Sequence, residues 1–206
     1  MLDVRVRIYR NPWADRVPLQ ELAKILLHVG QIRAAHIESQ IAAGNYDKDD
    51  DKFALVFLDP TAPISTPSSD TLMASIEIGD AHHLLANGIA KAFWHRDHGL
   101  MAGYGAYVNP LTCGDGEFAW GYSTKVEDTY GGGSGLSQEA DAMEVGHALV
   151  SFNYAIRMAC KRWFENKLVA RGRPSWYCNQ NEPGALYTEM AERTDTIFDD
   201  TVRAAD

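Results

Sequence analysis

The sequence predicts an α+β fold: a single domain in which helices pack on a mixed or antiparallel sheet. The chain has 206 residues, of which 46% are hydrophobic and 23% are charged, as in an ordinary globular domain. Short stretches with apolar residues at every second position alternate with longer stretches of helical spacing, in the order β-α-β-β-α-β-β-α-α. Residues 1–206 are therefore expected to form one domain, with 174–206 as a C-terminal loop-and-helix extension.

The first elements follow from the change in period. Residues 2–9 alternate between apolar and polar side chains, which predicts a half-buried strand. From Pro18 the apolar spacing becomes helical and continues to Gly44, an expected C-cap, while Gly30 is expected to divide or bend this helix. A continuous apolar run predicts a buried strand at Phe53–Leu58.

The middle of the chain repeats this pattern. Alternation predicts a strand over residues 72–78, and Asp80 is expected to be the N-cap of a helix over residues 84–93. Two strand-like runs then follow at Met101–Val108 and Glu117–Val126.

A glycine-rich segment, Gly131–Gly135, is predicted to be a loop. Ser137 is the expected N-cap of a long helix that carries an apolar stripe as far as Trp163. The loop is interpreted as a plain connection, an anion-binding turn or a flap over a site. In the last two cases Gly132 and Gly133 would contact a substrate.

The charge balance argues against general nucleic-acid binding. There are 28 acidic and 19 basic residues, giving a formal net charge of −9, and such a chain repels a phosphate backbone. One group of basic residues stands out near the end of the long helix, and we interpret it as a solvated helix face or as a site for an anionic partner. Its members are Arg157, Lys161, Arg162, Lys167, Arg171 and Arg173.

Cysteine spacing and hydropathy lead us to expect a cytoplasmic protein. The three cysteines, Cys113, Cys160 and Cys178, form no CxxC pair and indicate neither a disulfide framework nor a zinc site. The N-terminus has no signal-peptide pattern, and no apolar run is long enough to span a membrane.

The densest polar group surrounds the second predicted helix. His95, Asp97 and His98 lie within four residues near its end, and His82 and His83 precede it. Imidazoles with a carboxylate can bind a metal, act as a general base with its orienting partner, or simply favour the helix C-terminus. We expect His95, Asp97 and His98 to be catalytic, and we assign no metal ligand.

Four aromatic residues are expected to wall a substrate pocket if one face of the sheet is open; otherwise they are cross-strand packing. They are Tyr104, Tyr107, Trp120 and Tyr122.

Two other patterns carry less information. Glu144 and His147 form a Glu-x-x-His pair, but a di-iron bundle needs two copies and the chain has one. Cys113, His147 and Asn179 follow the chain order of some cysteine hydrolases, but no family signature surrounds the cysteine, and we interpret the order as a coincidence.

Several short blocks resemble the formaldehyde-activating enzyme family. They include Thr71–Met73, Ile76–Ala81 and His98-Gly99, and further on Asn153-Tyr154 followed by Ala159 and Arg162. The resemblance covers about a third of the chain. It implies an α+β fold similar to a ribosomal-protein domain, condensation of formaldehyde with a tetrahydropterin cofactor, and His98 as a site residue.

We therefore expect a small-molecule enzyme with proton-transfer or aldehyde chemistry, with His98 as the acid–base group and Asp97 orienting an imidazole. The residues themselves identify no cofactor. The alternative is a non-catalytic protein that forms homo-oligomers or binds a partner. Self-association is expected in either case.

Overall fold

The centre of the structure, a computed structural model that describes residues 2–98 and 123–172, is a five-stranded sheet with the order β1-β3-β2-β5-β4. Every neighbouring pair is antiparallel. The predicted α+β class with an antiparallel sheet is therefore confirmed. The strands are β1 (Val4–Ile8), β2 (Phe53–Leu58), β3 (Leu72–Ile78), β4 (Ser123–Val126) and β5 (Thr129–Ser134).

In the described part of the chain, three α-helices accompany the sheet: α1 (Leu19–Ala42), α2 (Leu85–His98) and α3 (Gln138–Ala170). The cap predicted for α3 is confirmed, because the backbone N–H of Ala140 donates to Ser137 Oγ at 3.3 Å. Gly44 follows α1 with a φ of +75°, as a helix-ending glycine does. The prediction that Asp80 caps the second helix is wrong. A short 3₁₀ turn, His82–Leu84, precedes α2, and its N-cap is Ala81.

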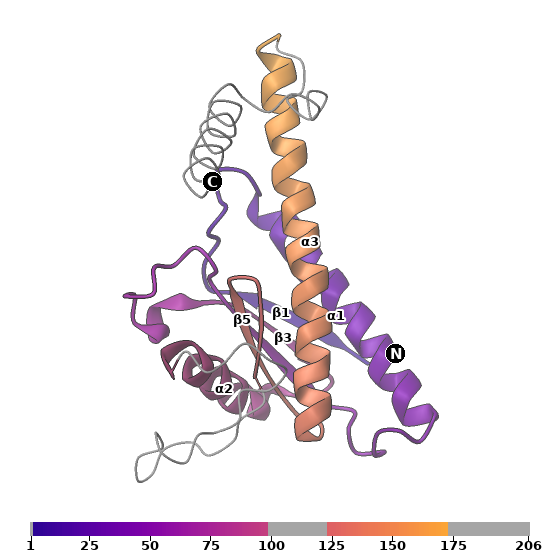
Figure 1. Cartoon of the computed structure of the whole chain (residues 1–206). Coiled ribbons are helices and arrows are strands. Elements are labelled where there is room, and N and C mark those ends of the chain that lie inside the picture. Colours follow the sequence, from indigo (N-terminus) through magenta and orange to yellow (C-terminus); the bar gives the residue numbers. More distant parts are fainter. Residues whose placement is uncertain (1, 99–122, 173–206) are drawn as a thin grey trace, which may run out of the picture. The chain divides into compact units, whose positions relative to one another are not determined.

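The helices lie on both faces of the sheet (Figure 1). Successive side chains of a strand point to opposite faces, and β2 is buried along its whole length. Its residues Phe53, Leu55 and Phe57 belong to the core that includes buried residues of α1 and α3. Its residues Ala54 and Val56 pack in a second, smaller core with α2. The layers are thus α1 and α3, then the sheet, then α2.

Gly30 was expected to divide or bend α1, but the helix is continuous from Leu19 to Ala42. The glycine instead permits a close approach to the sheet. A Cβ at this position would lie 2.6 Å from Val4 Cγ1 and 2.7 Å from Ile76 Cγ2, well inside van der Waals contact. Gly30 therefore sets the distance between α1 and strands β1 and β3.

The prediction of a loop at Gly131–Gly135 is also wrong, because Gly131, Gly132 and Gly133 lie inside β5. A Cβ on Gly132 would meet the carbonyl oxygen of Gly88 in α2 at 2.0 Å. On the opposite face, a Cβ on Gly133 would meet Val145 Cγ2 in α3 at 2.6 Å. A glycine run in a strand marks a close approach of other chain segments, and here two helices make that approach.

The chain divides into two compact units, Met1–Cys160 and Lys161–Asp206. The first holds the sheet, α1, α2 and the part of α3 that ends at Cys160. In the second, Lys167 Nζ lies 4.1 Å from the centroid of the Trp163 ring. In the part of the chain that the structure describes, none of the helices combines the length and apolar character needed to cross a membrane.

Several predictions fall outside the described residues. They are the strand at 101–108, most of the strand at 117–126, and the extension at 174–206. The four aromatic residues assigned to a substrate pocket, Tyr104, Tyr107, Trp120 and Tyr122, lie there too.

The contact between β5 and α2 can be tested with Gly132→Ala. The methyl group would overlap backbone atoms of α2, so we expect a loss of about 3 kcal/mol in the free energy of unfolding, measured with urea. The control is Gly44→Ala, whose Cβ meets nothing within 4 Å and costs only the strain of a positive φ, about 1 kcal/mol. Equal losses in the two variants would contradict this packing.

Candidate functional site

The side chains of His95 and Asp97 occupy different surroundings. Residues two positions apart leave a helix about 200° from each other. His95 is 1% exposed, and its ring lies edge-on to Tyr130 of β5, with centroids 5.1 Å apart. Asp97 is exposed and accepts a hydrogen bond from Ser68 Oγ. His98 is the last residue of α2, and its side chain lies outside what the structure describes.

Arg96, between these residues, has a structural role. It is 4% exposed, and its guanidinium donates to the carbonyl oxygens of Thr66 at 2.7 Å and Pro63 at 2.8 Å. It also donates to Ser68 Oγ at 3.1 Å. Arg96 thereby attaches the proline-rich connection between β2 and β3 to α2.

The surroundings of Gly132 and Gly133, the two glycines predicted to contact a substrate, are filled. The backbone of α2 lies against Gly132, and the side chains of Val145 and Phe53 lie against Gly133.

The strongest cluster of interacting polar groups centres on Glu144 of α3, whose side chain is fully buried. Arg33 of α1 donates from Nη1 to Glu144 Oε2 at 3.1 Å. His36, one turn later on α1, lies with Nδ1 2.6 Å from Glu144 Oε1. The phenol of Tyr46 donates to the same oxygen at 3.0 Å. A buried carboxylate is stable only when it is paired and hydrogen-bonded, and these three groups meet that requirement.

The hydrogen bonds assign the tautomer of His36. An ionised carboxylate can only accept hydrogen bonds, so the hydrogen of His36 is assigned to Nδ1, which donates the hydrogen bond to Glu144. His36 Nε2 then holds a lone pair and faces the Gln40 amide nitrogen at 3.3 Å. The Gln40 carbonyl oxygen accepts from the Asn45 amide at 2.7 Å, which fixes the orientation of the Gln40 amide. The three hydrogen bonds thus point the same way: Asn45 donates to Gln40, Gln40 donates to His36, and His36 donates to Glu144.

Burial raises the pKa of Tyr46 well above its ordinary value, and the nearby charge of Glu144 raises it further. The phenol therefore keeps its proton at neutral pH and acts as a donor to Glu144. Tyr46 reaches this position because the chain turns at Gly44, directly after α1.

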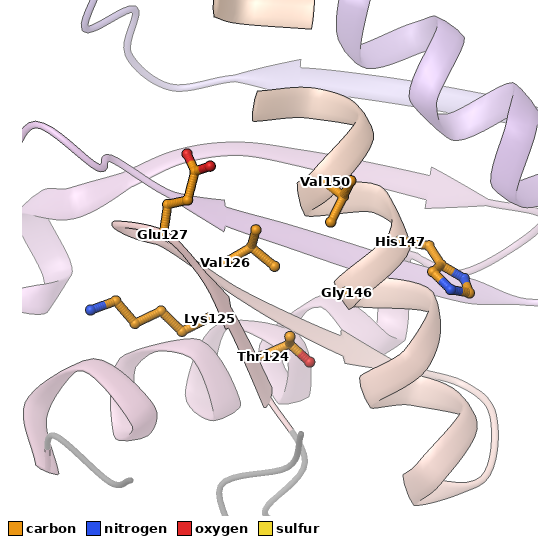
Figure 2. Close-up of a pocket in the computed structure, with 7 residues that line it drawn as sticks. All are labelled: Thr124, Lys125, Val126, Glu127, Gly146, His147 and Val150. Carbon is orange, nitrogen blue, oxygen red and sulfur yellow. The ribbon is translucent and has the colours of Figure 1, made fainter. Parts of the chain in front are cut away.

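A groove of about 390 Å³ lies between β4 and α3 (Figure 2). It is lined by residues Thr124–Glu127, Gly146, His147 and Val150. Figure 2 shows the side chain of Val126 projecting toward α3, while the ring of His147 leaves the helix on the other side. That ring stands edge-on to His36, with centroids 6.3 Å apart. The imidazole of His147 therefore lies with the Glu144 cluster, on the side of α3 away from β4.

Two interactions position β4 beside α3. Thr124 Oγ1 donates to the carbonyl oxygen of Ala142 at 2.8 Å, which ties the strand to the helix. Lys125 points away from the groove, with Nζ 4.9 Å from the centroid of the Tyr130 ring. The groove is consequently lined mainly by apolar atoms, and the imidazole of His147 points away from it, toward His36.

A smaller cavity of about 220 Å³ is lined among others by Thr129, Asn153, Arg157 and Cys160. Its polar groups largely satisfy one another: Thr129 donates to Asn153 at 2.9 Å, and Arg157 pairs with Glu127. Burial raises the pKa of the Cys160 thiol, which leaves it protonated and weakly nucleophilic at neutral pH. This cavity offers less chemistry than the groove.

A second buried ion pair joins α2 to α3. Lys91 Nζ lies 2.6 Å from Asp141 Oδ2 and also donates to the carbonyl oxygen of Gly133 at 2.8 Å. The other carboxylate oxygen of Asp141 accepts from the backbone N–H of Leu136 at 3.0 Å. Burial raises the pKa of Asp141 to about 6, and Lys91 opposes that rise without cancelling it.

Within residues 2–98 and 123–172, no group of three or more His, Cys, Asp or Glu side chains is placed to hold a metal ion.

Sequence reasoning missed Arg33, His36 and Tyr46. It considered Glu144 only as half of a di-iron pair with His147, and it considered His147 otherwise only in a cysteine-hydrolase order that was interpreted as a coincidence. A signal was present, because Glu144 stands beside Val145 in the apolar stripe of a long helix. A carboxylate in that position predicts a buried charge that needs a cation. Its partners come from residues about 100 positions earlier, and local spacing gives no information about them.

No family model, curated protein or solved structure matches this chain. The fold and the site define the class: an α+β protein with an antiparallel sheet and a carboxylate–imidazole cluster between α1 and α3. The resemblance to the formaldehyde-activating enzyme family stays a prediction.

The Glu144 cluster can be tested by Glu144→Gln. The change leaves Arg33 without its buried counter-charge, so we expect a loss of about 3 kcal/mol in the free energy of unfolding. The matched control is Glu139→Gln, an exposed glutamate on the same helix, with an expected change of about 0.5 kcal/mol or less. Similar urea denaturation midpoints for the two variants would contradict the cluster as described.

Asp141 predicts a pH dependence of stability. Its pKa is about 6 in the folded state and near its ordinary 3.8 in the unfolded chain, so between these values the folded state binds the extra proton. The contribution of Asp141 to the free energy of unfolding is thus complete below about pH 4 and is lost as the pH rises to about 6. The total change is on the order of 3 kcal/mol, at about 1.4 kcal/mol per pKa unit.

We expect the free energy of unfolding of the wild type, minus that of Asp141→Asn, to fall across this pH range. Urea denaturation at several pH values measures the difference. A difference that stays constant or rises with pH would contradict the assignment.

Proposed function

We propose that this chain is an enzyme that binds a small molecule beside His36 and His147, where α1 lies next to α3, and transfers a proton with His36. The observation that carries the proposal is the 2.6 Å hydrogen bond from His36 to the fully buried Glu144, next to the exposed His147, whose ring centroid lies 6.3 Å from that of His36. An imidazole that is oriented by a buried carboxylate and open to solvent on one side is a usual arrangement for acid–base catalysis.

The roles follow from the hydrogen bonds. Glu144 holds the imidazole of His36 in one orientation and one tautomer, and it balances the positive charge that forms when Nε2 takes up a proton. The side chain of His36 is 31% exposed, so a ligand at the surface can reach it. The Gln40 contact with Nε2 is long, at 3.3 Å, and a substrate can replace it. His147 would bind the substrate beside His36.

Small carbonyl compounds are the proposed substrate class, because a single positioned imidazole suits proton removal beside a carbonyl group. The sequence resemblance to the formaldehyde-activating enzyme family supports aldehydes within that class. The acidic composition and the cysteine spacing support a cytoplasmic location as part of this proposal. His98 stays a predicted acid–base residue.

Proton transfer can be measured directly. We expect the protein in D₂O to exchange the α-hydrogens of at least one member of a panel of small aldehydes and ketones, followed by ¹H NMR. His36→Asn should reduce this exchange by about 100-fold or more, the usual contribution of a general base. Asparagine keeps a donor near the position of Nδ1 and so preserves the contact with Glu144.

The matched control is His28→Gln, an exposed histidine on the same helix, which should exchange at the wild-type rate. His147→Gln should weaken substrate binding and raise KM. Undiminished exchange in folded His36→Asn would contradict the assignment of His36.

A further inference from the structure

Helix α3 is apolar on two opposite sides. Within residues 138–160, Val145 and Leu149 are buried against the sheet. Residues nine positions apart lie about 180° from each other on a helix, so Tyr154 lies opposite Val145. Tyr154 is 67% exposed, Val150 is 56% exposed and Met143 is 38% exposed. A helix that is apolar on both sides is usually covered on both, so the outer side needs a partner.

The exposed apolar residues belong to one stripe along the outer side of α3, which we call the outer stripe. Successive members are three or four residues apart, the spacing of side chains that meet a second helix. The outer stripe consists of Glu139, Met143, His147, Val150, Tyr154 and Arg157.

The outer stripe is complementary to itself when it is reversed. Two copies in antiparallel orientation, related by a two-fold axis between His147 and Val150, bring Met143 of each copy opposite Tyr154 of the other. The same axis places Glu139 opposite Arg157, a carboxylate opposite a guanidinium, at both ends. A parallel arrangement would instead place like charges together, which is unfavourable. Charge therefore selects the antiparallel arrangement and a second copy as the occupant.

We propose that the protein is a homodimer in which the outer stripes of two α3 helices pack antiparallel about a two-fold axis. The contact would extend over about 27 Å, at a rise of about 1.5 Å per residue, with the helix axes about 8–10 Å apart. An interface of this type is isologous, because both copies use the same surface. His147 belongs to the outer stripe and its ring lies beside His36, so the second α3 would lie beside the proposed proton-transfer site.

The oligomeric state tests the proposal without reference to activity. Sedimentation equilibrium of the wild type should give twice the 22.8 kDa of one chain. Val150→Glu places a charge at the centre of the contact and should give the mass of one chain. The control is Ile64→Glu, an equally drastic change at a residue that is 77% exposed and away from α3, and it should stay dimeric. A monomeric wild type, or a dimer that survives Val150→Glu, would overturn the proposal.

Charge reversal tests the antiparallel register. Glu139→Arg alone should raise the dimer dissociation constant about tenfold, because it sets two cations against each other at both ends. Arg157→Glu alone should do the same, and the double variant should restore the wild-type value. Arg157 also pairs with Glu127 in its own chain; Glu127→Gln, which removes only that pair, should leave dimerisation unchanged. A double variant as weak as either single one would overturn this register.

Discussion

The arrangement depends on how closely two helices approach one strand. Gly131, Gly132 and Gly133 remove side chains from both faces of β5, so the backbone of α2 lies against one face and Val145 of α3 against the other. Interiors are packed so densely that even a single added methyl group would have to displace a neighbour. This contact fixes the position of α3 over the sheet. The placement of Glu144 and His147 toward α1 and of the outer stripe toward solvent follows from it.

Buried charges then attach the elements to one another. Glu144 joins α3 to α1 through Arg33 and His36, and Lys91 with Asp141 joins α2 to α3. Breaking such a pair leaves an uncompensated charge in a medium that solvates it poorly. The ionisable groups that hold the helices together are therefore also the groups that can carry out acid–base chemistry. In the Glu144 cluster both roles fall on one carboxylate, which neutralises Arg33 and orients His36.

The candidate site shows where sequence reasoning reaches its limit. His95, Asp97 and His98 were predicted to form a catalytic site because they are close together in the chain. The helix, however, directs His95 and Asp97 to different surroundings. Arg33, His36 and Tyr46 are close to Glu144 only because α1 and α3 share one face of the sheet. A helix makes residues three or four apart neighbours, but it contains no information about which other helix will pack beside it.

The sequence by itself determined the α+β class, the strands at residues 53–58 and 72–78, the long helices, both ends of α1 and the start of α3. These features depend on local periodicity and on capping residues, which act within a few positions of the chain. Only the tertiary structure decided that the glycine segment is a strand, that Gly30 permits contact without bending α1, and that Glu144 meets His36. Each of these depends on the distance between segments far apart in sequence, and that distance is set by packing of the whole core.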